Sequence, residues 1–112
     1  MAFHFTRLRR PELLPSAVVP VLLKIGSNPK VEFIVLFGSR ALGDATETSD
    51  VDITVSAPTL LDAEWLEFRS LVEEAPTLLW ITLIRFEESP RELQDRNLRD
   101  GVVIYESAKA QR

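Results

Sequence analysis

The chain has 112 residues, of which 46% are apolar and 27% are charged, and it contains no cysteine. This composition is ordinary for a globular domain, and the lack of cysteine excludes disulfides, thiol catalysis and thiolate metal sites. The net charge of −4 argues against broad nucleic-acid binding, which needs a basic surface.

No apolar run is long enough to span a membrane, and no basic stretch precedes an apolar one at the N-terminus, so we expect a cytoplasmic protein. The length favours a single domain over residues 1–112. We expect residues 1–11 and 107–112 to be loosely ordered.

The first half of the chain contains two candidate helices and a buried strand. Because proline is tolerated only in the first turn of a helix, the first helix is expected after Pro15 and up to Ile25. Val31–Phe37 is β-branched and aromatic, which is typical of a strand buried on both faces. Ser39–Leu42 can open a short helix, and 44–49 is rich in turn residues.

The next segment, Val51–Ser56, alternates strictly. It predicts a strand whose odd-numbered side chains face a core, whereas Asp52 and Thr54 face solvent. A helix is then expected from Leu60 to about Ala75, with Thr59 and Asp62 as a capping box.

The C-terminal part predicts a strand, a helix and a last strand. Leu78–Phe86 is apolar throughout and fits a strand. Ser89 and Pro90 start a helix, with Ser89 as its cap, and Gly101 suits a left-handed conformation at its end. Val102–Tyr105 is the last strand. The predicted class is α/β (α+β), with a small mixed β-sheet of about four strands and helices packed on one face.

The residues with the strongest chemical signal are Gly38-Ser39 and Asp50-Val51-Asp52, separated by ten residues. Asp50 and Asp52 are two apart on an expected strand, so their carboxylates project to the same face. Two such charges repel each other unless a cation lies between them, and carboxylate oxygens suit Mg²⁺ or Mn²⁺. We therefore interpret Asp50 and Asp52 as metal ligands and catalytic residues.

Gly38 follows a buried strand and lets a ligand approach the backbone closely. Ser39 begins a short helix, where free N–H groups favour an anion, and Arg40 adds positive charge. Gly38, Ser39 and Arg40 are therefore the candidate triphosphate-binding residues. A lone Asp-x-Asp is usually a solvated strand face, and a lone Gly-Ser is usually a turn; the joint pattern, in a strand–turn–strand context, favours a phosphoryl or nucleotidyl transfer site.

These residues carry a family resemblance. The segment GSRALGDATETSDVDITV resembles the signature of the minimal nucleotidyltransferases of the DNA polymerase beta-like nucleotidyltransferase superfamily, and the similarity extends over roughly residues 16–106. The resemblance implies a nucleotidyltransferase-like fold, ATP or another NTP as substrate, two Mg²⁺ ions and transfer of AMP or another NMP. Gly38 and Ser39 would then hold the triphosphate, and Asp50 and Asp52 the metals.

The resemblance also implies a partner. Small members of the family often pair with a helical HEPN-type ribonuclease toxin, which some silence by AMP transfer and others by binding alone. Since a chain this short has little surface for an acceptor, we expect a protein partner or a homodimer to complete the site.

One residue departs from the family pattern. The third carboxylate of the family falls at Thr82, and threonine carries no charge and is a poor general base. Glu87 and Glu88 are the nearest acids, and at about 3.3 Å per residue they lie well over 10 Å along the strand. We therefore expect weak nucleotide and metal binding and slow or absent catalysis. Trp80 shares strand parity with Thr82, and either packs in the core or stacks on a base.

Overall fold

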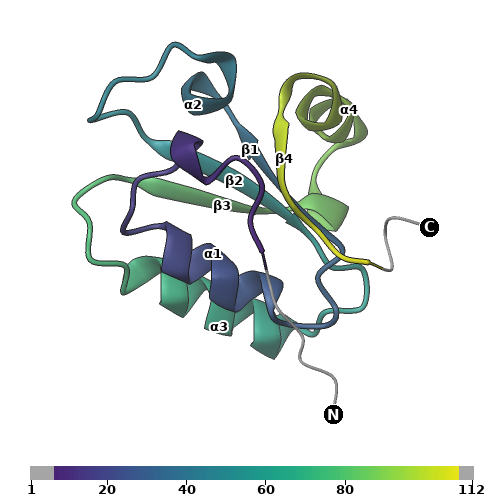
Figure 1. Cartoon of the computed structure of the whole chain (residues 1–112). Coiled ribbons are helices and arrows are strands. Elements are labelled where there is room, and N and C mark those ends of the chain that lie inside the picture. The colour runs from purple at the N-terminus through teal and green to yellow at the C-terminus, as the bar shows by residue number, and fades with distance from the viewer. Residues whose placement is uncertain (1–6, 109–112) are drawn as a thin grey trace.

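The computed structural model describes residues 7–108. The expectation of loose order at 1–6 and 109–112 falls outside the described residues. Figure 1 shows the elements in chain order. They are η1 (Pro11–Leu13), α1 (Val19–Gly26), β1 (Phe33–Phe37), α2 (Ser39–Leu42), β2 (Val51–Ser56), α3 (Asp62–Glu73), β3 (Ile81–Arg85), η2 (Phe86–Glu88), α4 (Arg91–Asp100) and β4 (Val102–Glu106).

The four strands form one mixed sheet in the order β3-β2-β1-β4. β1 pairs antiparallel with β2 and with β4, whereas β2 and β3 are parallel. The predicted class, an α/β fold around a small mixed sheet of about four strands, is confirmed. The third strand is shorter than the predicted 78–86, because the chain enters the sheet only at Ile81.

One face of the sheet packs against α1 and α3 and forms the core. The fully buried residues of this face include Ile34 and Leu36 of β1 and Val51, Ile53 and Val55 of β2. Burial of each such side chain stabilises the fold by roughly 1.5–3 kcal/mol. The core therefore fixes the parity of β2, and with it the face on which its even-numbered residues lie.

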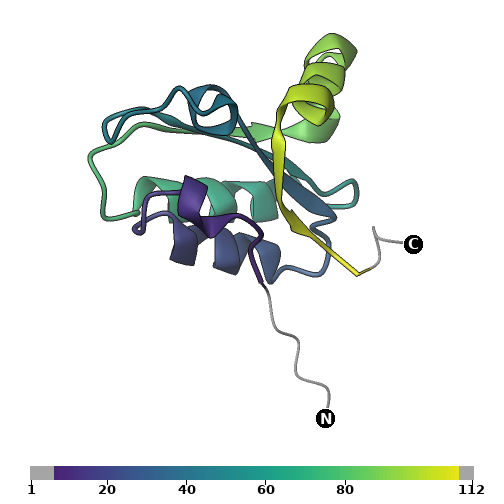
Figure 2. The same cartoon turned by 45° about the horizontal axis from the view of Figure 1, so that its top comes forward.

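The opposite face is not bare, which corrects two expectations. α4 lies across it, on the other side of the sheet from α1 and α3 (Figure 2). The prediction that the helices pack on one face therefore holds for α1 and α3 and not for α4. Thr54 is fully buried on this second face, not solvated as its alternation predicts. Its Oγ1 has no hydrogen-bond partner among the described residues, and neither has Nδ2 of the buried Asn97 in α4.

The helix boundaries correct three further expectations. α3 begins at Asp62, and the backbone N–H of Leu61 donates to Glu64, so Thr59 and Asp62 are not its capping pair. Ser89 donates its hydroxyl to the carbonyl of Arg85 and does not cap α4.

Gly101 has φ −81°, an extended conformation and not the predicted left-handed one. Glycine is needed there for space, since a Cβ would overlap Val35 and the backbone carbonyl of Asn97. α4 can therefore approach β1 closely only because Gly101 has no side chain.

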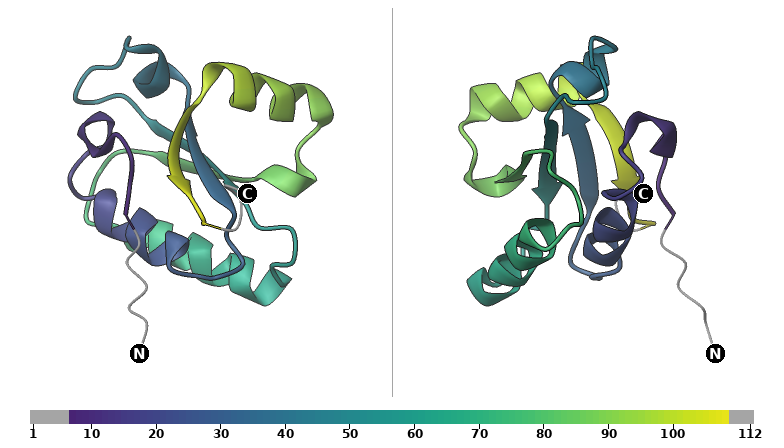
Figure 3. Two further views of the ribbon diagram at one scale, coloured as in Figure 1. Left: turned by 45° about the vertical axis from the view of Figure 1, so that its right-hand side comes forward. Right: turned by 90° about the vertical axis from the view of Figure 1, so that its left-hand side faces the viewer.

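The two edges of the sheet differ. At the β4 edge, the backbone N–H of Arg9 donates to the carbonyl of Ile104 at 2.6 Å, and Leu8 beside it is buried. The segment before η1 therefore runs along β4 (Figure 3), whereas no segment within residues 7–108 covers β3 in this way. Among residues 7–108, no helix is long and apolar enough to cross a membrane.

Glu64 ties α3 to the turn before β1. Its carboxylate accepts hydrogen bonds from Lys30 Nζ at 2.6 Å, from the Leu61 N–H at 3.0 Å and from Asn28 Nδ2 at 3.3 Å. The bond from Lys30, then that from Leu61, lowers the pKa of Glu64 from 4.5 to about 2. A depressed pKa in the folded state means that this contribution to stability is present above pH 4.5 and is lost as the pH falls toward 2.

We therefore expect the stability difference between the wild type and Glu64→Gln to shrink as the pH falls from 4.5 to 2, because protonation removes the same interaction. Urea unfolding across this range measures it. Glu67→Gln is the control, since Glu67 is exposed on the same helix and makes no ion pair in the described range. A pH-independent difference for Glu64→Gln would contradict this role.

Candidate nucleotide and metal site

The turn at Gly38 has a backbone geometry that only glycine adopts easily. Gly38 directly follows β1 and has φ 74° and ψ −156°. Its carbonyl accepts hydrogen bonds from the N–H groups of Ala41 and Leu42 at 3.1 and 3.2 Å, which closes the single turn of α2. The N–H groups of Ser39 and Arg40, at the start of that turn, have no acceptor within the helix.

The same turn lies against the carboxylate of Asp52. Phe37, the last residue of β1, is the register partner of Asp52 in the antiparallel β1–β2 pair. The contact is so close that a Cβ on Gly38 would overlap Oδ2 of Asp52. The segments predicted to meet, at 38–39 and at 52, are therefore neighbours in the structure.

Asp50 and Asp52 have no cation beside them. Asp50 is exposed just before β2, and Asp52 is half-buried. Within residues 7–108, neither side chain takes part in a hydrogen bond or ion pair, although six other acid–base pairs are formed. A cation bound at this point would therefore meet two carboxylates, two residues apart in the chain, that no other described side chain occupies.

Thr82 lies beside Asp52, as its place in the sequence predicts. The parallel register pairs Asp52 with Thr82, so the two side chains point to the same face of the sheet. No group of three or more histidine or acidic side chains suited to a metal ion occurs in the described part of the chain. The carboxylate pair is therefore not completed by a third acid from elsewhere in the fold.

The two nearby acids that could replace it are held at the other end of the sheet. Glu87 accepts hydrogen bonds from the Ser56 hydroxyl at 2.6 Å and the Ala57 N–H at 2.8 Å. Glu88 forms an ion pair with Arg85 at 3.2 Å. The prediction that Glu87 and Glu88 lie too far from Thr82 to replace its missing carboxylate agrees with these contacts, because each acid has a structural partner beyond the end of β3.

Arg40 has a contact that the sequence did not predict. Its guanidinium donates to the carbonyl of Ser49 through Nη2 at 2.8 Å and through Nε at 3.2 Å, and to that of Glu47 at 3.4 Å. These bonds hold the loop that leads into Asp50. Arg40 is therefore a positioning residue for the loop, and phosphate binding by Arg40 stays a prediction that rests on its remaining donors.

Trp80 is not a core residue, because 73% of its side chain is exposed. Its backbone carbonyl accepts from the Val51 N–H at 2.9 Å, and its ring lines a groove between α3 and β3. Core packing, one of the two interpretations of Trp80, is therefore wrong.

The donor set fits a hard divalent cation. Asp50 and Asp52 offer only oxygen ligands, and the carboxylate of Asp52 can lie against the turn because Gly38 lacks a Cβ. Mg²⁺ binds in many sites through one or two carboxylates, with waters and substrate phosphates as the other ligands. Asp50 and Asp52 would hold such an ion, and the chemistry of the donors favours Mg²⁺ or Mn²⁺.

Comparison with protein families gives a match over residues 23–110 to the family described as "Polymerase beta, Nucleotidyltransferase". The chain belongs to this family. The match covers the turn at Gly38, both aspartates and Thr82, so the family predicted from the sequence is confirmed. A comparison with functionally curated proteins gave no significant match.

Solved structures of similar fold include toxin–antitoxin structures and a nucleotidyltransferase-type protein. A toxin–antitoxin structure with AMP-PNP is 23% identical, with a TM-score of 0.61 over 83% of this chain and 73% of the other. A Tyr-to-Ala variant of the MntA-HpeT toxin–antitoxin is 26% identical, with a TM-score of 0.60 over 86% and 76%. A nucleotidyltransferase-type protein from Sulfolobus solfataricus is 22% identical, with a TM-score of 0.51 over 88% and 81%.

The contact between Gly38 and Asp52 predicts that Gly38→Ala impairs the site beyond its effect on stability. Alanine at a positive φ costs about 1–2 kcal/mol, and here its Cβ also displaces the Asp52 carboxylate. Gly43→Ala is a matched control, because Gly43 has φ 82° and a Cβ there meets no atom within 4 Å. We expect thermal destabilisation of both variants, larger in Gly38→Ala because of its clash with Asp52, and loss of Mn²⁺ affinity only in Gly38→Ala. Equal Mn²⁺ affinities in the two variants would contradict the site.

Proposed function

We propose that this protein binds ATP or another NTP together with Mg²⁺ and transfers the nucleotidyl group slowly to a protein acceptor. The observation that carries this proposal is the position of Asp52, which lies between the Gly38 turn on one side and Thr82 on the other. The first neighbour provides room for the triphosphate, and the second replaces the residue that the family uses to complete the site.

The proposed binding mode assigns roles to four residues. Gly38 and Ser39 hold the triphosphate through the turn backbone and the Ser39 hydroxyl, and Asp50 and Asp52 hold the metal ions. When bound, the ions neutralise the phosphate charge and favour attack on the α-phosphate. The similar toxin–antitoxin structure that contains AMP-PNP supports a nucleoside triphosphate as the ligand.

Thr82 limits the proposed reaction. A carboxylate at this position could accept the proton of an incoming hydroxyl, whereas the threonine hydroxyl is a poor base. Loss of a general base typically costs 10²–10⁴ in rate. The site therefore supports nucleotide and metal binding better than it supports rapid turnover.

The proposed acceptor is a HEPN-type toxin. This proposal is supported by the relatives that were crystallised as MntA-HpeT toxin–antitoxin structures, one of them a variant in which two aspartates two positions apart are replaced by glutamate. That spacing is the spacing of Asp50 and Asp52.

The second candidate is an antitoxin that neutralises its toxin by binding alone. Thr82 is the observation that favours it, because the site then needs no catalytic base. The two candidates differ for Asp50→Ala: neutralisation by binding survives this change, whereas neutralisation by transfer does not.

Restoring the missing carboxylate is the direct test of slow transfer. We expect Thr82→Asp to raise the transfer of labelled AMP on the order of 10², because it places an acid beside Asp52. Thr82→Asn is the matched control, since asparagine has the same shape and lacks the base. Rapid transfer by the wild type, or no gain in Thr82→Asp when it still binds ATP, would contradict the proposed function.

A further inference from the structure

The outer edge of β3 offers backbone groups without partners. The Trp80 carbonyl accepts from the Val51 N–H of β2, and backbone groups alternate in direction along a strand. The N–H and C=O groups of Ile81 and Leu83 therefore point away from β2, and none of them forms a hydrogen bond within residues 7–108.

Native proteins usually protect such an edge with lysine, proline or a bulge. The first four residues of β3 are Ile, Thr, Leu and Ile, and the register with β2 is regular. The fifth, Arg85, is largely buried in ion pairs with Asp62 and Glu88 and does not present its charge at the edge. At the other edge, by contrast, the Arg9 N–H already occupies the carbonyl of Ile104 in β4. The β3 edge is thus open and has none of these protective features.

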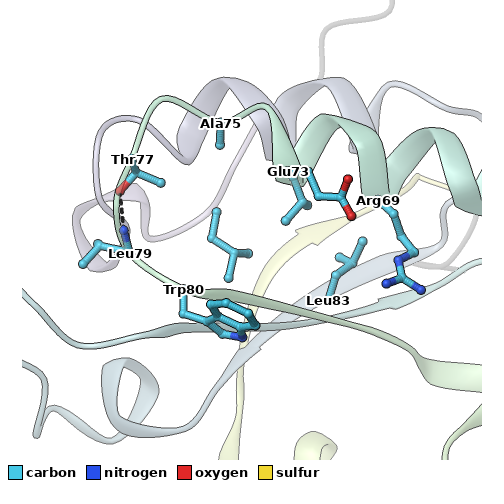
Figure 4. Close-up of a pocket in the computed structure, with 9 residues that line it drawn as sticks. Arg69, Glu73, Ala75, Thr77, Leu79, Trp80 and Leu83 are labelled. Atoms are coloured by element: carbon cyan, nitrogen blue, oxygen red, sulfur yellow. Dashed lines mark hydrogen bonds between the residues drawn. The ribbon is translucent and has the colours of Figure 1, made fainter.

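Apolar side chains lie beside this open edge. Leu78 and Trp80 precede β3 and have exposed fractions of 105% and 73%. Next to them is a groove of about 490 Å³ between α3 and β3, shown in Figure 4. Its apolar lining is Val72, Ala75, Leu79, Trp80, Ile81 and Leu83. A contiguous apolar surface at an open edge is typical of an interface.

The charges at the groove match a second copy of the same surface. Arg69 and Glu73 are one turn apart on α3 and both point toward the groove (Figure 4). Both are exposed, and neither forms an ion pair in the described part of the chain. A two-fold axis at the β3 edge runs the two α3 helices antiparallel, which places Arg69 of one copy opposite Glu73 of the other.

We propose that the β3 edge and the adjoining groove form the interface of a two-fold homodimer, in which the β3 strands of two copies pair antiparallel. Such a contact is self-complementary in all three respects: in backbone hydrogen bonding, in apolar surface and in charge. It continues the sheet across the axis, so the second copy adds nothing over Asp52 and Thr82 on either face of the sheet. This inference is independent of the proposed nucleotide chemistry.

Sedimentation equilibrium of the full chain tests the proposal. We expect a mass of twice 12.7 kDa at about 0.1 mM protein, with dissociation on dilution. Trp80→Lys should shift the protein to monomer, and its melting temperature should equal that of the wild type when both are diluted to monomer, because the side chain is exposed. Leu66→Lys is the control at another exposed apolar position, with an exposed fraction of 61%, and should remain dimeric.

Charge reversal tests the two-fold geometry itself. Arg69→Glu alone and Glu73→Arg alone each place like charges opposite one another and should weaken the dimer at least tenfold, whereas the double reversal should restore it. A wild type that is monomeric at about 0.1 mM would overturn the proposal. The groove would then be left for a different protein, which is also an outcome against the homodimer. A dimer that is insensitive to Trp80→Lys and to both single reversals would overturn it as well.

Discussion

The register of β2 between its two neighbours is the constraint on which the candidate site depends. β2 pairs antiparallel with β1 and parallel with β3, and these two pairings place Asp52 beside Phe37 on one side and beside Thr82 on the other. The core holds this register, because Val51, Ile53 and Val55 are fully buried between them. A slip by one residue would expose these three side chains and bury both aspartates.

The packing that fixes the site also leaves it electrostatically incomplete. The Gly38 turn can approach Asp52 because glycine has no Cβ, so the carboxylate is held in place without a cationic partner. The buried core stabilises the fold enough to hold this locally unfavourable arrangement in place, as is common at functional sites. A divalent cation would supply the missing partner of Asp52, but Thr82 would leave that cation with fewer protein ligands than the family pattern provides. The proposed function therefore separates nucleotide binding from rapid turnover.

Much of this arrangement follows from the sequence alone. The alternation of Val51–Ser56 sets the parity of Asp52, and the family resemblance assigns Thr82 to the position of the third carboxylate, which the register confirms as the neighbour of Asp52. What the sequence does not reveal depends on long-range packing. The alternation of its strand predicts that Thr54 is solvated, yet Thr54 is buried on the face that α4 covers. The position of Gly101 after α4 predicts a left-handed conformation, whereas its backbone is extended and the missing side chain makes room for Val35.

The contacts of the Arg40 guanidinium are another feature of the site that depends on long-range packing and that the sequence does not reveal. A basic residue next to a phosphate-binding turn predicts a phosphate ligand, and local sequence gives no sign that the carbonyls of Glu47 and Ser49 come within its reach. The open edge of β3 is likewise invisible until the order of the strands is known, since the segment 81–84 has the composition of an interior strand.

The most direct test of the site is a crystal structure with Mn²⁺ and a non-hydrolysable ATP analogue, in which the anomalous signal locates the metal. The account predicts an Mn²⁺ peak within bonding distance of the carboxylates of Asp50 and Asp52, with the triphosphate against the backbone of Gly38 and Ser39. A triphosphate bound elsewhere, or manganese coordinated without either aspartate, would contradict it.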